Sequence, residues 1–223
     1  MSNKIVDPIV AQLMGLRYKS HPWHGVSMGD ECPQKVTAFI EMVPTDTVKY
    51  EIDKASGYLR LDRPNKYSNV VPALYGFLPQ TYSGDLVAKI SQEKIDDPTI
   101  KGDGDPIDII VLTEKEITHG NILVTARPIG GFRMIDQNEA DDKIIAVLDN
   151  DAMYEDFTEI DQLPHMVVDR LKHYFMTYKD MPGKKRNVKI PHIYGAKEAQ
   201  DIISQSQEDY NNRFNNLEGI LGR

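Results

Sequence analysis

The chain of 223 residues contains a single cysteine, Cys32. One cysteine excludes an intrachain disulfide and is typical of a protein kept in a reducing compartment. Long apolar runs are also missing, because no stretch reaches the roughly 20 residues that a membrane-spanning helix needs. Residues 1–15 hold no uninterrupted apolar segment of the signal-peptide kind. We therefore expect a cytoplasmic protein with no membrane partner.

Positively charged residues are also fewer than negatively charged ones. The chain has 26 lysines and arginines against 34 aspartates and glutamates, a net charge of -8. This excess disfavours nucleic acid and anionic membranes as partners, and it would repel an anionic ligand unless cations lay between them. With 40% hydrophobic residues the chain can bury a sizeable core. We find no repeat and no change in composition, so we expect one domain over 1–223, with an N-terminal extension over 1–34.

The most informative stretch is KGDGDPID at 101–108, which runs into the apolar segment IIVL at 109–112. It places Asp103, Asp105 and Asp108 within six residues of one another. Its glycines permit a tight turn, and Pro106 is suited to the first positions of a strand. The pattern predicts an acidic loop that leads into a buried strand. Crowded carboxylates repel one another, and hard divalent cations with oxygen ligands offset that repulsion.

Three other structures could contain acidic residues in such a pattern. A solvated acidic turn fits the Asp and Gly content, but it does not explain an aspartate inside an apolar strand. An EF-hand calcium loop needs glycine at its sixth position, where Asp108 stands when the count begins at Asp103. A phosphatase with an Asp-x-Asp nucleophile would place the pair after the apolar strand, whereas here the strand follows the pair.

Further strands are predicted on both sides of this stretch. Residues 36–42 form one run, and 48–53 and 58–63 form a hairpin. Charge alone suggests that Lys49 and Glu51 lie on a solvated sheet face. The segment 121–134 is too long for one straight strand, and its two adjacent glycines at 130–131 suggest a bulge or bend. A second acidic turn, 136–143, precedes another apolar strand at 144–148, so the two turns could face each other across a cleft.

The remaining segments predict loops and helices. Residues 63–80 indicate a long ordered loop, and 83–101 a polar surface insertion. Helical spacing favours a helix over 164–178 and a long terminal helix from Ala196, with apolar positions as far as Leu221. Two histidines, His21 and His24, lie in a Pro- and Gly-containing segment without a third nearby ligand. This arrangement favours a packing or surface role over metal binding.

Taken together, these motifs resemble the family I soluble inorganic pyrophosphatases of the longer bacterial branch. DGDPIDI at 103–109 is similar to the family signature. Similar segments occur in the family's order at 39–41, 49–53, 62–63, 75–76, 126–130, 136–143 and 178–180. Each is a weak indication alone, but the ordered set spans about 41–179. The segment 21–25 also looks like that of longer bacterial members.

The resemblance implies a mixed, mainly β fold, namely a closed five-stranded OB-type β-barrel flanked by α-helices. It implies hydrolysis of inorganic pyrophosphate to two phosphates with several Mg²⁺ ions, for which Mn²⁺ is a possible substitute. It implies a homo-oligomer, with a hexamer favoured over a dimer. By position, metal binding is carried over to Asp103, Asp108, Asp141, Asp136, Glu41 and Glu51. The general base is carried over to Asp105, and phosphoryl binding to Lys49, Arg63, Tyr75, Lys143, Tyr178 and Lys179.

Two departures and two rival functions stay open at this point. Val71 and Leu74 stand where many bacterial members have Tyr and Asn, and the shortest members lack the 83–101 insertion. A different metal-dependent phosphohydrolase acting on nucleotides is one rival, although no nucleotide loop stands out. The other is a non-enzymatic OB-type binding module, which would need a basic, aromatic surface. Acidic motifs disfavour that module and nucleic acid as a partner.

Overall fold

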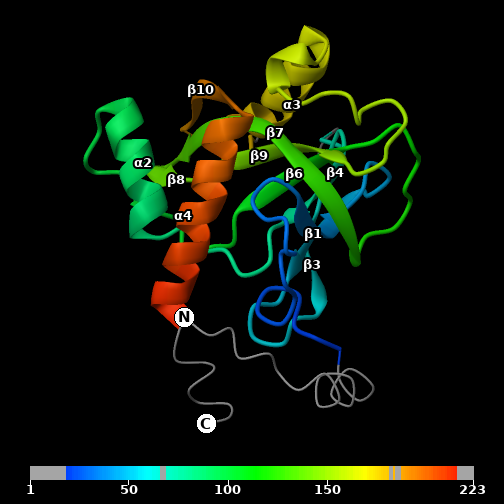
Figure 1. The fold of residues 1–223 in the computed structure, drawn as a ribbon, viewed down its shortest axis with the longest axis horizontal. Coiled ribbons are helices and arrows are strands. Elements are labelled where there is room, and N and C mark those ends of the chain that lie inside the picture. Colours follow the sequence, from blue (N-terminus) through cyan, green and yellow to red (C-terminus); the bar gives the residue numbers. More distant parts are fainter. Residues whose placement is uncertain (1–18, 66–68, 181–182, 184–186, 215–223) are drawn as a thin grey trace.

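The structure is a computed structural model that describes residues 19–65, 69–180, 183 and 187–214 (Figure 1). Part of the expected N-terminal extension lies outside these ranges, as does the predicted end of the terminal helix at Leu221. Within these ranges, no helix has the length and apolar content needed to cross a membrane.

In the described part of the chain, eight strands form the main sheet, and two more form a separate hairpin. The main sheet contains β1 (Val36–Met42), β4 (Leu74–Phe77), β5 (Lys101–Gly102), β6 (Asp108–Leu112), β7 (Ile122–Asp136), β8 (Glu139–Ala140), β9 (Lys143–Leu148) and β10 (Val188–Gly195). Its central order is β1-β4-β6-β9-β7, and β7 also pairs with β1, so these five strands form a ring of pairings. The hairpin consists of β2 (Val48–Ile52) and β3 (Leu59–Pro64).

The two central strands, β6 and β9, are buried on both faces. Ile109 on β6 and Ile144 on β9 belong to one buried cluster, whereas their neighbours Ile110 and Ile145 belong to a second cluster. Side chains alternate between the two faces of a strand, so the continuous apolar runs in the sequence supply both clusters. Such runs are typical of strands without a solvated face.

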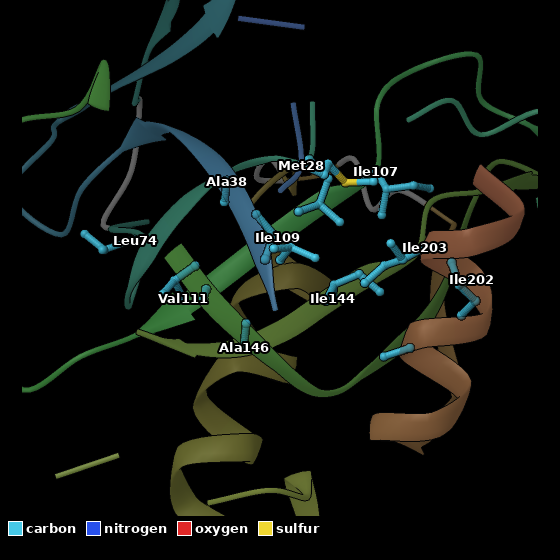
Figure 2. Close-up of a cluster of buried hydrophobic side chains, with 14 of the residues drawn as sticks. Met28, Ala38, Leu74, Ile107, Ile109, Val111, Ile144, Ala146, Ile202 and Ile203 are labelled. Carbon is cyan, nitrogen blue, oxygen red and sulfur yellow. The ribbon is translucent and has the colours of Figure 1, made fainter. Parts of the chain in front are cut away.

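Among the residues that the structure describes, three α-helices cover this sheet (Figure 1): α2 (Asp85–Ile95), α3 (His165–Thr177) and α4 (Ala196–Phe214). Figure 2 shows Ile202 and Ile203 of α4 reaching the first cluster, beside Ile144. On the other side, Leu171 and Phe175 of α3 pack into the second cluster. The predicted mainly β fold with a long C-terminal helix is therefore confirmed.

The long strand β7 joins the parts of the sheet. Its first half pairs with β1 and its second half pairs with β10. The pairing with β9 shifts register between Pro128 and Gly130, where the adjacent glycines predicted a bulge. Gly130 has a φ of 157° and lies against the backbone of Tyr194, with no room for a side chain. The bulge allows one strand to serve two differently oriented neighbours.

Two segments differ from the loops expected for them. Residues 83–101 contain the helix α2, whose Val87, Ala88 and Ser91 are buried. The carboxylate of Asp209 on α4 accepts hydrogen bonds from backbone N–H groups in the first turn of α2, including that of Val87 at 3.1 Å. This cap comes from 122 residues further along the chain, so no local signal reveals the helix. Within 63–80, the four residues of β4 pair with β1 and β6.

Candidate active site

The two acidic turns meet because β6 and β9 are parallel neighbours. Asp108 begins β6 and is in register with Lys143, the first residue of β9. In a parallel pair, the residues that precede both strands lie at the same end of the sheet. The turn at 103–108 and the turn at 136–142 therefore face each other, as their repeated pattern predicted.

These turns form one wall of a cavity of about 250 Å³. All the predicted site residues except Arg63 line it. They are Glu41, Lys49, Glu51, Tyr75, Asp103, Asp105, Asp108, Asp136, Asp141, Lys143, Tyr178 and Lys179. Arg63 lines a smaller adjoining cavity, which shares Lys49, Tyr75 and Tyr178 with the first. The fold thus gathers the whole predicted set into one region.

Two carboxylates of the first turn, those of Asp103 and Asp108, are only partly accessible to water. Burial, reinforced by the charge of Asp141, raises the pKa of Asp103 well above its ordinary value. Burial also raises the pKa of Asp108, although the nearby Lys143 ammonium acts against this shift. The hydroxyl of Tyr75 donates a hydrogen bond of 2.8 Å to Asp108 Oδ2. Binding a cation would relieve the cost of ionising these groups.

Lys143 lies at the centre of the acidic wall. Its buried ammonium contacts the carboxylates of both Asp108 and Asp141, and both anions hold the pKa of Lys143 well above its ordinary value despite its burial. Lys179 approaches from the opposite side, with Nζ 2.7 Å from Asp136 Oδ2 and 3.8 Å from Asp141 Oδ2. Carboxylates and ammonium groups therefore alternate across the cavity.

The opposite wall comes from β1 and the hairpin. Glu41 of β1 is buried, and burial raises its pKa to about 8, although its hydrogen bond from the backbone N–H of Ile52 acts against the shift. Lys49 Nζ lies 2.7 Å from Glu51 Oε2 and 3.6 Å from Asp62 Oδ2. The solvated face suggested for Lys49 and Glu51 by charge alone is wrong, because both side chains line the cavity.

Asp105 occupies the more open side of the cavity. Its backbone N–H donates to Asp103 Oδ1 at 3.0 Å, which fixes the turn. Its carboxylate forms an ion pair with Lys54, which lies between β2 and β3. The ring of His21 lies 3.2 Å from the carbonyl oxygen of Lys54 and packs against Gly57. The segment that precedes β1 therefore supports the turn between β2 and β3, which carries Lys54.

Sequence reasoning missed several residues at the site. Lys54 was interpreted only as part of a hairpin turn. Tyr174, Asn65 and Asn69 line the adjoining cavity beside Arg63. The sequence pattern does not mark these three residues as functional. Tyr174 fits the apolar spacing of a helix, and the two asparagines belong to a Pro- and Asn-rich loop. Val71 is fully buried and supplies no polar atom.

His24 has a packing role, as expected for the histidine pair. Its ring stacks on Trp23 with centroids 4.5 Å apart, and its Nδ1 lies 2.8 Å from the hydroxyl of Tyr210.

The donor set at the acidic wall fits hard divalent cations. Asp103, Asp108 and Asp141 offer partly buried carboxylate oxygens, and oxygen ligands are those that Mg²⁺ and similar ions prefer. In the described ranges, however, no three histidine, cysteine or acidic side chains converge on one point as a formed metal site requires. The contacts of Lys143 with both Asp108 and Asp141 account for part of this arrangement.

Comparison with known proteins agrees with this geometry. The family model described as inorganic pyrophosphatase matches residues 38–211. The chain belongs to the inorganic pyrophosphatase family. The matched range contains every residue assigned above to the acidic wall, its opposite wall and the adjoining cavity.

Relatives of this pyrophosphatase family extend the match over most of the chain. An inorganic pyrophosphatase from Chlamydia caviae is 51% identical over 199 residues, which cover 87% of this chain and 92% of that protein. Soluble inorganic pyrophosphatase 2 from Chlamydomonas reinhardtii is 35% identical and covers 87% of this chain and 91% of its own length. The crystal structure of inorganic pyrophosphatase from Thermus thermophilus superposes with a TM-score of 0.71 at 27% identity, over 86% of this chain and 99% of that one. The resemblance inferred from the motifs is confirmed.

Proposed function

We propose that this protein hydrolyses inorganic pyrophosphate to two phosphates. The observation that carries the proposal is the presence of carboxylates and ammonium groups side by side around one cavity, with the buried Lys143 between Asp108 and Asp141. A highly charged anion needs cations on every side, and water must be activated beside it. Membership of the pyrophosphatase family supports the same reaction.

We assign the metal-binding role to the acidic side chains, with Mg²⁺ as the ion and Mn²⁺ as a possible substitute. Asp103, Asp108 and Asp141 would hold the tightest ions, and Asp136 an ion that arrives with substrate. Glu41 and Glu51 would take part partly through water. When bound, the ions supply positive charge to the phosphoryl oxygens and lower the pKa of coordinated water.

Asp105 is the proposed general base. It lies in the same turn as Asp103 and Asp108 but on the more open side of the cavity, where water can reach it. Its carboxylate would accept a proton as the water oxygen bonds to phosphorus and the bridging P–O bond breaks.

The cationic and hydroxyl side chains are assigned to the phosphoryl groups. Arg63 can contact two phosphate oxygens at once, since its guanidinium is planar. In the free enzyme Lys143 and Lys179 contact carboxylates, and they would exchange these partners for phosphoryl oxygens. The residues assigned to phosphoryl binding are Lys49, Arg63, Tyr75, Lys143, Tyr178 and Lys179.

Phosphate release from three substrates side by side tests the function. With Mg²⁺ present, we expect rapid release from pyrophosphate and little from ATP or a phosphomonoester. Faster release from ATP would instead favour a nucleotide phosphohydrolase. Tight binding of an oligonucleotide without any phosphate release would favour the OB-type binding module.

The finer features of fold, assembly and location are also proposals. We propose that the ring of β1, β4, β6, β9 and β7 is a closed OB-type barrel, which is supported by the pairing of β7 with β1. We propose a cytoplasmic homo-oligomer, with a hexamer favoured over a dimer. The measured mass in solution distinguishes these assemblies.

A further inference from the structure

A fully buried arginine, Arg133 on β7, contacts residues in four other parts of the fold. Its Nε lies 3.1 Å from Asp142 Oδ1, just before β9, and its Nη2 lies 2.8 Å from Glu198 Oε1 on α4. Its Nη1 donates to Ser91 Oγ on α2 at 3.3 Å. The guanidinium also lies over the ring of Tyr194 on β10, 5.3 Å from its centroid. No residue of this cluster lines the cavity of the active site.

Asp142 is the link between this cluster and the active site. It stands in sequence between Asp141 and Lys143, which both line the cavity. Successive side chains in extended backbone point to opposite sides, and Asp142 accordingly turns away from the cavity to the buried Arg133. The contact between Asp142 and Arg133 therefore fixes the orientation of the backbone at Asp142. This orientation in turn sets the directions in which the side chains of Asp141 and Lys143 point.

This segment has few other constraints. The backbone N–H of Asp141 donates to the carbonyl of Met134 at 2.9 Å, but the regular pairing with β6 and β7 begins only at Lys143. A buried ion pair is a weak source of stability, because desolvation offsets most of its attraction. An apolar pair would fill this space, but it would not draw the Asp142 carboxylate towards one buried charge, as the Arg133 guanidinium 3.1 Å away does.

We propose that the Arg133–Asp142 pair positions Asp141 and Lys143 for metal and phosphate. The inference rests on the proposed function and deepens it. Neither residue touches the reacting groups. They act on a metal ligand and a phosphate-binding lysine through the backbone that joins them, as outer partners of metal ligands do.

Glu198 provides a matched control, because it is the other carboxylate partner of Arg133. Glu198→Gln and Asp142→Asn each replace one carboxyl group beside the same guanidinium by an amide, with little change in shape. Both should lower the free energy of unfolding. Only Asp142→Asn should weaken Mg²⁺ binding, by about 10- to 100-fold, the usual effect of losing an outer-shell partner. Arg133→Lys keeps the positive charge but lacks the planar guanidinium with its several N–H donors. Its Mg²⁺ affinity should lie between those of the other two variants.

The measurement is calorimetric titration of each variant with Mg²⁺ in the absence of substrate, beside its denaturant unfolding curve. Unchanged Mg²⁺ affinity in Asp142→Asn would overturn the inference. Equal losses of affinity in Asp142→Asn and Glu198→Gln would also overturn it, since the cluster would then act only through stability. If Asp142→Asn does not fold, the same comparison between Arg133→Lys and Glu198→Gln decides. Failure of the wild type to hydrolyse pyrophosphate would contradict the proposed function separately.

Discussion

Asp108 and Lys143 stand opposite each other on two parallel strands, and the lysine ammonium contacts the aspartate carboxylate. The same ammonium contacts Asp141, so one buried cation offsets part of the charge of two proposed metal ligands. Without such a cation, the crowded carboxylates would repel one another in a poorly solvated site. A metal that binds at this wall would share the carboxylates of Asp108 and Asp141 with the Lys143 ammonium.

Removal of metal should stop turnover without unfolding the protein. Excess EDTA is expected to abolish phosphate release while the circular dichroism spectrum stays the same, because Lys143 remains to offset the carboxylates. Added Mg²⁺ should restore the rate. Ca²⁺ prefers longer bonds and looser coordination, so it should compete with Mg²⁺ and inhibit. Undiminished turnover in EDTA would contradict the metal-dependent mechanism.

Asp105 and Asp108 should have separable roles. Asp105→Asn keeps the shape of the side chain but removes the base, so turnover should fall by a factor on the order of 10²–10⁴, with Mg²⁺ affinity much less affected. Asp108→Asn should lower metal affinity sharply. Rates at saturating metal, measured beside metal titrations of each variant, test the difference. If extra metal returns Asp105→Asn to the wild-type rate, Asp105 is a ligand and not the base.

Lys54 should contribute modestly to substrate binding. It lines the cavity on a partly exposed side and pairs with Asp105, and an exposed ion pair is worth at most about 1 kcal/mol. Lys54→Met should therefore raise the KM for pyrophosphate roughly two- to fivefold. Lys115→Met is the control, because Lys115 pairs with Glu114 away from the cavity. Steady-state kinetics that give the two variants the same KM would rule out this role.

His24 should make stability depend on pH. Burial, followed by the charge of His21, lowers the pKa of His24 to about 4, whereas an unfolded histidine has a pKa of about 6.5. The folded state therefore favours the neutral ring, and this contribution is complete above pH 6.5. It is lost progressively as the pH falls towards 4, because the unfolded chain binds the extra proton first.

The corresponding variant is His24→Gln, which keeps a hydrogen-bonding side chain near Tyr210 but has no titrating ring. The free energy of unfolding should fall more steeply between pH 7 and pH 5 in the wild type than in His24→Gln. Denaturant unfolding at several pH values measures both slopes. Parallel slopes would mean that His24 does not titrate differently in the folded and unfolded chains.

Asp209 should stabilise the helix α2. Its carboxylate is an acceptor for the N–H groups of Gly84, Leu86 and Val87. Asp209→Ala is expected to cost roughly 1–2 kcal/mol, the upper range for loss of a helix N-cap. Asp201→Ala is the control, since its exposed pair with Lys197 on α4 should contribute under about 0.5 kcal/mol. Equal midpoints of denaturant unfolding in the two variants would argue against the cap.

The sequence predicted strand positions best where a strand is buried and its residues form a continuous apolar run. The runs at 36–42 and 144–148 predicted β1 and β9 to within a residue, because apolar, β-branched runs of that length suit few other structures. The acidic turns were equally clear, since Asp103, Asp105 and Asp108 in one turn have little use in a packed core.

Other features depend on contacts that no local pattern encodes. The helix α2 has a Gly N-cap without a side-chain hydrogen bond of its own, and Asp209 supplies the missing acceptor from α4. The four-residue strand β4 contains a glycine, Gly76, whose position against the backbone of Phe39 leaves no space for a side chain. Lys54 shows no distinguishing sequence signal, because its importance comes from the distant Asp105 that it contacts.

The parallel pairing of β6 with β9 also bears on how the chain folds. Asp108 and Lys143 are 35 residues apart, and the cavity they share also takes side chains from Glu41 to Lys179. No short segment of the chain therefore contains the whole binding site. Closing such large loops is entropically costly and slow, so helical structure can form before the cavity exists. During refolding, recovery of catalysis therefore reports the final long-range pairings, whereas far-ultraviolet dichroism reports the helices.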